Sequence, residues 1–144
     1  MFQLDLDSRL TAWTEFRKKL EKARQPLLKV AEFWSNPPYV AYNKDIDPYN
    51  PRSWPTPWEI IQRNRYDDLT KAVMMAWTLI YTERYRNSTI HLIGYLDTAD
   101  NMYYNCVIVD DEQVLNYKDN LVIPADNLPP SFRLENLVEL KRPK

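Results

Sequence analysis

Residues 67–85 read DDLTKAVMMAWTLIYTERY, and this stretch decides the fold. Apolar side chains surround most of the circumference of a helix drawn from Leu69 to Tyr85, which is typical of a helix buried on nearly all sides. Asp67 and Asp68 stand where carboxylates favour a helix N-terminus. The stretch therefore predicts a central helix that runs to about Tyr85, with the rest of the chain packed around it.

Downstream of this helix, the apolar period changes from helical to alternating, as it does in β-strands. Strands are expected at residues 89–96, 102–109 and 114–117, and residues 121–123 can form a fourth. Because the connecting segments are short, the strands should form a small antiparallel meander with one apolar face against the central helix.

The alternation also suggests a register for this meander, in which residue 96 faces residue 102 and residue 109 faces residue 114. This register places Cys106 on the apolar face that meets the helix, whereas His91 falls on the opposite face. Their side chains should therefore diverge, and a thiolate–imidazolium pair is not expected.

Upstream of the central helix, residues 8–34 carry apolar side chains at helical spacing, with Asp7 or Ser8 as the cap of the helix. Pro26 removes a backbone donor and should kink or split this segment. Thr56, followed by Pro57 and Glu59, forms a capping-box pattern that predicts a short helix. We therefore expect an α+β fold with N-terminal helices, a buried central helix and a small antiparallel sheet.

Residues 36–56 read NPPYVAYNKDIDPYNPRSWPT and hold five of the eleven prolines, so they can form neither a helix nor a central strand. The segment is too aromatic for a flexible linker, and we expect an ordered arm. Its rings lie either on the domain or on a partner protein. The candidate interface residues are Tyr42, Tyr49 and Trp54.

The 144 residues are interpreted as one domain, 1–144. It comprises a helical segment at 8–34, the arm at 36–56, a helix-plus-sheet core at 57–123 and a tail at 124–144. The tail is expected to form a terminal strand or a short helix that ends in a mobile tip.

Single counts of glycine, histidine and cysteine exclude many functions. A phosphate-binding loop or dinucleotide fingerprint needs several glycines, and structural zinc needs about four Cys or His ligands. A net charge of −1 gives no electrostatic reason to bind nucleic acid or a membrane. We therefore expect no cofactor, metal, nucleic acid or membrane partner, and the N-terminus does not resemble a signal peptide.

The remaining chemical patterns have simpler interpretations. Acidic side chains in residues 45–50 are spaced as in a calcium loop, but the glycine and closing glutamate of an EF-hand are missing, and Asx turns before proline explain them. The pairs Asp67/Asp68 and Asp110/Asp111 fit helix capping and turn formation rather than acid–base catalysis. The arm aromatics could stack on nucleobases, but a basic groove is absent.

The order of these elements resembles the core of the transglutaminase-like branch of the cysteine-protease-like fold. The similar features are a helix opening at Tyr66-Asp67-Asp68-Leu69, a strand opening at Tyr103-Tyr104 and a further strand ending at Asn116-Tyr117. In that family a nucleophilic cysteine begins the helix, a histidine opens a following strand and an aspartate lies on the next.

The resemblance implies a degenerate site, because none of the three catalytic residue types stands at these positions. Tyr66 and Asp67 stand at the helix start, Tyr104 at the strand opening and Asn116 on the last strand. We expect these residues to be vestigial, since acyl transfer would lack its nucleophile and its proton path.

A second resemblance, carried by Asp47-Pro48, the stretch Arg52 to Glu59, Tyr66-Asp67 and Thr78-Leu79, is to small uncharacterised proteins of large tailed phages, including cyanophages. It implies a viral protein, located in the virion or in the host cytoplasm, that binds other protein subunits. We therefore expect a non-catalytic structural or protein-binding protein, in which an enzyme fold serves as scaffold.

Two alternatives remain open. One is a hydrolase or acyltransferase of the same fold with an unorthodox site near Tyr66, Asp67 and Tyr104. The other is a soluble binder of a host protein that uses the acidic sheet edge, because residues 97–131 hold seven acidic side chains and only Lys118 as a cation.

Overall fold

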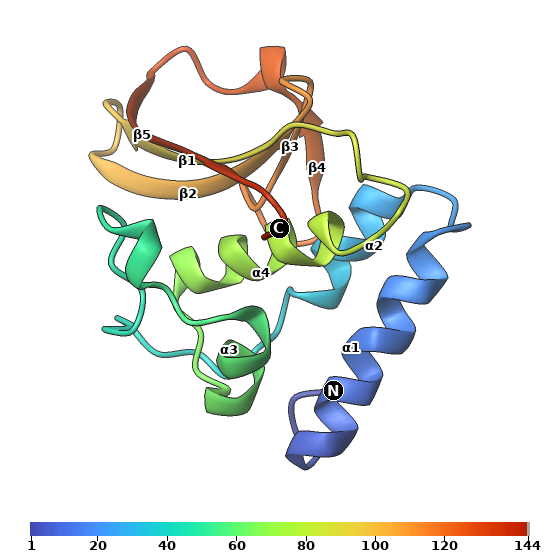
Figure 1. The fold of residues 1–144 in the computed structure, drawn as a ribbon. Coiled ribbons are helices and arrows are strands. Elements are labelled where there is room, and N and C mark those ends of the chain that lie inside the picture. Colours follow the sequence, from blue (N-terminus) through green and yellow to red (C-terminus); the bar gives the residue numbers. More distant parts are fainter. Residues whose placement is uncertain (144) are drawn as a thin grey trace.

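The centre of the fold is helix α4 (Asp68–Ile80), which runs beneath the sheet in the computed structural model of this chain (Figure 1). The structure describes residues 1–143. Asp67 caps the helix, because its carboxylate accepts a hydrogen bond from the Thr70 backbone N–H. Most of the side chains of α4 are buried, as its apolar circumference predicts.

The helix ends at Ile80, five residues before the predicted end at Tyr85. Thr82 terminates it, because its hydroxyl donates to the Leu79 carbonyl and accepts from the Tyr85 backbone N–H. The Arg142 guanidinium donates to the Ile80 and Thr82 carbonyls and so binds the negative end of the helix. Side-chain capping by a buried threonine and by the distant tail overrides the apolar pattern.

The N-terminal segment forms two helices, α1 (Leu6–Leu20) and α2 (Pro26–Phe33), because Pro26 splits it rather than kinking it. Gln25 adopts a left-handed conformation, with φ 53°, immediately before Pro26. The predicted caps Asp7 and Ser8 are both wrong, since the carboxylate of Asp5 accepts from the Ser8 backbone N–H at 2.8 Å. The helix therefore begins two residues earlier than expected.

Helix α3 (Pro57–Arg63) confirms the capping-box prediction. Its two reciprocal bonds join Thr56 to Glu59, and Asn64 ends the helix in the left-handed conformation. Two short 3₁₀ turns, η1 (Pro51–Ser53) and η2 (Ala125–Asn127), lie in the connecting segments.

The sheet has five antiparallel strands in the order β4-β3-β2-β1-β5. The first four strands form the predicted meander, and the tail supplies the fifth, as a strand rather than a helix. After β4 the chain crosses the outer face of the sheet to reach the edge beside β1, as the orange segment in Figure 1 shows. The strands are β1 (Ile90–Asp97), β2 (Met102–Val109), β3 (Gln113–Leu115), β4 (Val122–Pro124) and β5 (Phe132–Leu140).

The predicted register is wrong by one residue at both hairpins. Met102 pairs with Asp97 rather than with residue 96, and Val109 pairs with Gln113 rather than with residue 114. Asp97 extends the strand because its carboxylate accepts from the Ala99 backbone N–H and closes the turn. A shift of one residue moves every affected side chain to the other face of the sheet.

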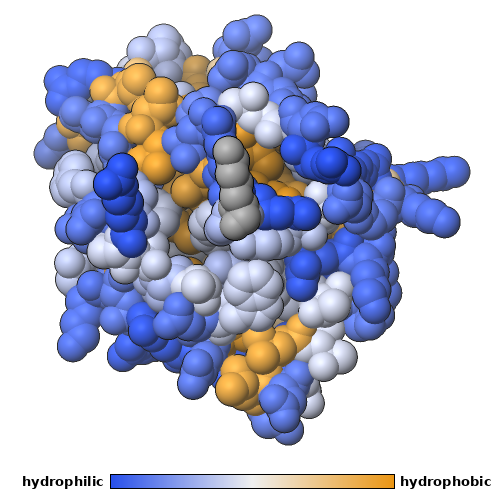
Figure 2. Space-filling view, viewed as in Figure 1, coloured by the Kyte–Doolittle hydropathy of each residue, from blue (hydrophilic) through white to orange (hydrophobic). Residues whose placement is uncertain are grey.

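The sheet consequently separates two groups of buried side chains. The main core lies between the sheet and the helices, where Leu92, Val107 and Leu115 meet the side chains of α1, α2 and α4. A smaller core lies on the outer face beneath the crossing segment, and contains Ile93, Cys106, Ile108 and Val114. In the face drawn in Figure 2, the exposed apolar side chains form separate patches surrounded by hydrophilic ones.

The three helices α1, α2 and α4 meet at one hydroxyl group. Thr78 Oγ1 accepts the indole N–H of Trp13 at 2.9 Å and that of Trp34 at 3.0 Å, and donates to the Met74 carbonyl at 2.6 Å. All three side chains are completely buried, so no water can replace the acceptor.

We predict that Thr78→Val destabilises the fold by about 2 to 4 kcal/mol, because two buried indole donors lose their acceptor while the side-chain volume is unchanged. Thr78→Ser keeps the hydroxyl and should cost about 1 kcal/mol or less. Urea unfolding of both variants measures the difference, and a Val variant as stable as the Ser variant would contradict the role of this acceptor.

Candidate functional site

Three polar residues meet at the start of α4, and each comes from a different element. Asp68 is the first residue of α4, Asn105 lies in the middle of β2, and Asn116 follows β3. One oxygen of the Asp68 carboxylate accepts from the Asn105 backbone N–H at 3.2 Å and from its side-chain amide at 3.0 Å. The other oxygen accepts from the Asn116 side-chain amide at 3.2 Å. We call these residues the Asp68 network.

The backbone positions these groups. Asn116 is 5% exposed and has φ 65°, a left-handed conformation that asparagine tolerates better than most residues. Its side-chain amide also donates to the Asn105 carbonyl at 2.8 Å, so the end of β3 is joined to β2 as well as to α4. The network therefore joins α4 and β2 through Asn116, the residue directly after β3.

The Asp68 carboxyl has a pKa above its ordinary value, mainly because surrounding protein disfavours its charged form. The hydrogen bonds from Asn105 and Asn116 and the nearby Lys71 ammonium oppose this effect. The side chain nevertheless reaches water, so the effect of the surrounding protein is partly screened. Asp68 is thus an accessible carboxyl whose pKa has moved toward neutral pH.

Sequence reasoning placed Tyr66 and Asp67 in this site, and the structure separates both from it. Tyr66 is completely buried against Phe2 and Trp34, and this burial raises the pKa of its phenol. The Asp67 carboxylate already has three hydrogen-bond donors, because it accepts from the Thr70 backbone N–H, the Thr70 hydroxyl and the Asn43 backbone N–H. The Asp67 oxygens are therefore occupied, and the Tyr66 hydroxyl is buried without a hydrogen-bond partner among the described residues, away from the network.

Tyr104 is also outside the network, because the one-residue register shift turns it to the outer face. It stacks on Phe132 there, with the ring centroids 5.0 Å apart, and its hydroxyl approaches Asp100 at 3.4 Å. Of the four predicted residues, only Asn116 belongs to the network. Asp68 and Asn105 were missed, although each directly follows a residue that was named.

The argument that separated Cys106 from His91 is wrong, since both lie on the outer face of the sheet. Cys106 pairs with Ile93, and His91 pairs with Ile108. Burial, rather than separation from His91, makes a reactive thiolate unfavourable. Cys106 is completely buried in the smaller core, and this burial raises the pKa of its thiol to about 12.

The arm runs beside the start of α4, as the segment preceding α3 in Figure 1 shows. The Asn43 side-chain amide donates to the Arg65 carbonyl and to the Thr70 hydroxyl, and Asn43 is 5% exposed. The Trp54 indole N–H donates to the Asp47 carbonyl at 2.6 Å. Trp54 is therefore half-buried and holds the arm, rather than projecting from it.

Two of the predicted interface residues are exposed, Tyr42 by 72% and Tyr49 by 80%. They border a surface cleft of about 290 Å³, here called the arm groove, beside the start of α4. Tyr103 of β2 forms another part of its wall. Its lining residues are Tyr42, Ile46, Pro48, Tyr49, Asp67, Leu69, Tyr103 and Asn105.

The Asp45–Asn50 segment is occupied by internal contacts. The Asp45 carboxylate pairs with the Arg65 guanidinium at 2.8 Å, and Asp47 accepts from the Tyr49 backbone N–H in an Asx turn. No cluster of three or more His, Cys, Asp or Glu side chains suited to a metal ion occurs within residues 1–143. No described helix is long and apolar enough to cross a membrane.

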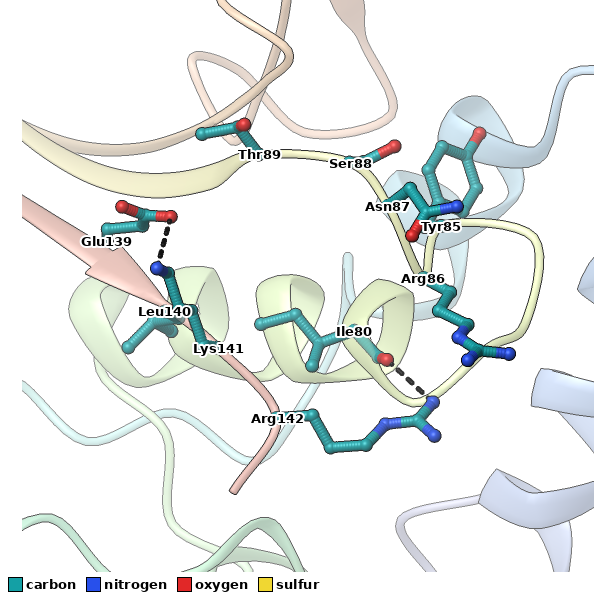
Figure 3. A pocket seen from close by; sticks show the side chains of 10 residues that line it. All are labelled: Ile80, Tyr85, Arg86, Asn87, Ser88, Thr89, Glu139, Leu140, Lys141 and Arg142. Carbon is teal, nitrogen blue, oxygen red and sulfur yellow. Dashed lines mark hydrogen bonds and ion pairs between the residues drawn. The ribbon is translucent and has the colours of Figure 1, made fainter. Parts of the chain in front are cut away.

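A second cleft, of about 410 Å³, lies at the opposite end of α4 (Figure 3). Its charged side chains have internal partners, since Lys141 pairs with Glu139 at 3.6 Å and Arg142 donates to the Ile80 carbonyl. Ser88 and Thr89 supply hydroxyls, but no histidine lines this cleft. It does not contain a nucleophile with a base.

Comparison with solved structures shows a transglutaminase-like fold. Calcium-bound LapG of Legionella pneumophila matches with a TM-score of 0.68 and 18% sequence identity, over 91% of this chain and 74% of the LapG chain. No family model matches the sequence. No curated protein matches it either.

We predict that the Cys106 thiol of the folded protein is inert toward iodoacetamide at pH 8, because it is buried and protonated. Mass spectrometry should find no modification within an hour in buffer and complete modification in 6 M urea, a denaturing concentration of roughly the size used for small domains. Rapid labelling of the native chain would show that this thiol is accessible after all.

We predict that the Asp68 carboxyl makes stability depend on pH. Its folded-state pKa is raised above the ordinary 3.8, so its contribution is complete below about pH 4 and is lost as the pH rises through the folded-state pKa. The free energy of unfolding of the wild type minus that of Asp68→Asn should thus be largest near pH 4 and decline toward neutral pH.

Urea titrations across this pH range measure the difference. Asp68→Ala also removes the titrating group. The difference in unfolding free energy between the wild type and this variant should therefore show the same decline with pH, whatever hydrogen bonds each variant loses. A difference that is constant with pH would mean that the carboxyl has an ordinary pKa.

Proposed function

We propose that this chain is a non-catalytic protein-binding protein that uses a transglutaminase-like fold as a scaffold. The observation that supports this most is the composition of the Asp68 network. Its residues lie at a helix start, in the middle of one strand and directly after the next, within a residue or two of the positions where the family resemblance expects cysteine, histidine and aspartate. Here they are Asp68, Asn105 and Asn116.

These residues cannot perform the acyl transfer of that family. An asparagine amide does not titrate and cannot take a proton from a nucleophile. The cysteine of this chain is buried in the other core, and its pKa of about 12 opposes thiolate formation. The hydrogen bonds of the network join α4, β2 and the end of β3, so in this proposal the network has a structural role.

The arm groove is the surface that we assign to partner binding. Tyr42 and Tyr49 expose rigid aromatic rings, a residue type that dominates the binding energy of protein interfaces. Trp54 contributes indirectly. Its indole N–H donates to the Asp47 carbonyl, and this hydrogen bond fixes the part of the arm that leads from the tyrosines to α3. The partners in this proposal are protein subunits.

The proposed setting is a tailed phage, with the chain as a virion component. The support is the resemblance of the Pro-rich and aromatic stretch from Asp47 to Glu59 to small phage proteins, and most of that stretch belongs to the arm. In a protein that does not catalyse a reaction, the surface is the part that can bind partners.

We predict that mass spectrometry finds this chain in purified particles, and that a Tyr42→Ser, Tyr49→Ser double variant is lost from them. Both side chains are exposed, so the variant should fold and circular dichroism should confirm this. The matched control is Tyr39→Ser, which removes an equally exposed tyrosine, 73% accessible, outside the groove. A chain found only in the lysate, as a monomer by light scattering, would favour a soluble binder of a host protein.

A second candidate function is a hydrolase that uses Asp68 as a general base, because its raised pKa and its access to water suit that role. Hydrolysis of ester or peptide substrates that disappears in Asp68→Asn and persists in Asp126→Asn would favour it. This is the weaker candidate, because both Asp68 oxygens already accept hydrogen bonds from Asn105 and Asn116.

A further inference from the structure

We propose that the arm groove binds a proline-rich, extended segment of the partner protein. This inference rests on the proposed protein-binding function and adds the chemistry of the ligand. Three tyrosines, Tyr42, Tyr49 and Tyr103, line the groove together with the apolar side chains of Ile46 and Leu69. Grooves lined by aromatic rings are the surfaces on which proline rings pack in the polyproline II conformation.

The position of Tyr103 is built into the strands. Its phenol lies over Gly94 of β1, where an added Cβ would collide with the ring and with its hydroxyl oxygen. Gly94 is the single glycine of the chain, and it stands in a strand interior, where glycine weakens the strand. The absence of a side chain at this point allows one wall of the groove to lie close to the sheet.

The other walls are fixed before any ligand arrives. The Asn43 backbone N–H donates to the Asp67 carboxylate at 3.0 Å, and the Asn136 side-chain amide donates to the Pro48 carbonyl at 3.1 Å. These bonds tie the arm to α4 and to β5. Because the groove is already formed and a proline-rich segment is already extended, little ordering entropy is lost on binding.

The hydrogen-bonding groups of the groove also match such a ligand. Proline lacks a backbone N–H, so a proline-rich chain offers carbonyl acceptors with few donors of its own. The hydroxyls of the exposed Tyr42 and Tyr49 can donate to those carbonyls. The one carboxylate in the lining, Asp67, already accepts from Thr70 and Asn43.

The charge of the groove argues against a nucleic acid as the ligand. Its lining contains no lysine or arginine, and its single charged side chain is acidic. A phosphate backbone needs cations that neutralise it, whereas a proline-rich peptide does not. A neutral or basic extended peptide is the ligand that these residues favour.

The test uses the full chain and fluorescein-labelled decaproline, with binding followed by fluorescence anisotropy and by amide chemical shifts. Wild type should bind, with shifts confined to the groove residues. Tyr42→Ser and Tyr49→Ser should each weaken binding about tenfold or more. Tyr103→Phe, which keeps the ring and removes the hydroxyl, should weaken it less than either.

Two matched controls accompany these variants. Tyr39→Ser should leave the affinity unchanged, because Tyr39 lies outside the groove lining. A decamer of alternating glycine and serine, which is flexible and lacks rings, should not bind. Equal binding of the two peptides, or equal weakening by Tyr39→Ser, would overturn the proposal.

Other outcomes separate this inference from the proposed function. If the Tyr42/Tyr49 double variant is lost from particles but wild type does not bind decaproline, the protein-binding function stands and the proline-rich ligand is wrong. Binding of cellohexaose in the groove, without decaproline binding, would assign the tyrosines to a sugar. Decaproline binding by wild type that is reduced in the groove variants supports the inference even if no particle contains the chain.

Discussion

The architecture depends on one buried hydroxyl. Thr78 Oγ1 accepts the indole N–H groups of Trp13 and Trp34, which come from α1 and from the end of α2. Two large aromatic side chains therefore share a single polar acceptor inside an apolar core, where an unpaired donor would be costly. The hydroxyl in turn donates to Met74 within α4, so all of its hydrogen-bonding capacity lies inside the protein.

This arrangement sets the position of α4, and the position of α4 sets the site. With the helix held from below by the tryptophans, its N-terminal end points at the middle of β2 and at the end of β3. Asp68 then reaches Asn105 and Asn116, and Asp67 reaches the arm through Asn43. The network and the arm groove are thus two sides of the same helix terminus.

Much of the fold could be predicted from local signals. The capping box at Thr56, the split at Pro26 and the bounds of β2 follow from short-range chemistry that the structure confirms. The register failed because the turns contain no glycine to mark them. Asn101, Asp110 and Asp111 adopt positive φ values in these turns, so the point at which each strand ends is invisible in the apolar pattern.

The error on β2 follows from that same slip, because moving one residue along the strand exchanges Tyr104 for Asn105. The error at the helix start is separate: Asp67 was named, but it serves as the cap of α4, and its neighbour Asp68 belongs to the network. Asn116 was named because the resemblance matches it to the aspartate position, and in the structure it adopts a left-handed conformation that asparagine tolerates. When no glycine marks the turns, the sequence thus predicts the helices and strands that carry a site. It predicts less accurately which side chains of those elements face the site.

In the proposed function, the Asp68 network joins the helix to the sheet without taking part in catalysis. At the start of α4 the Thr70 backbone N–H, which has no partner within the helix, donates to the Asp67 carboxylate. The Asp68 carboxylate instead accepts from the Asn105 backbone and side-chain amides and from the Asn116 side-chain amide, and these hydrogen bonds need neither a thiol nor an imidazole. The polar contact between helix and sheet therefore consists of hydrogen bonds among Asp68, Asn105 and Asn116, which use the polar atoms of these side chains. Binding, in this proposal, uses the neighbouring groove, where the Tyr42 and Tyr49 rings are exposed.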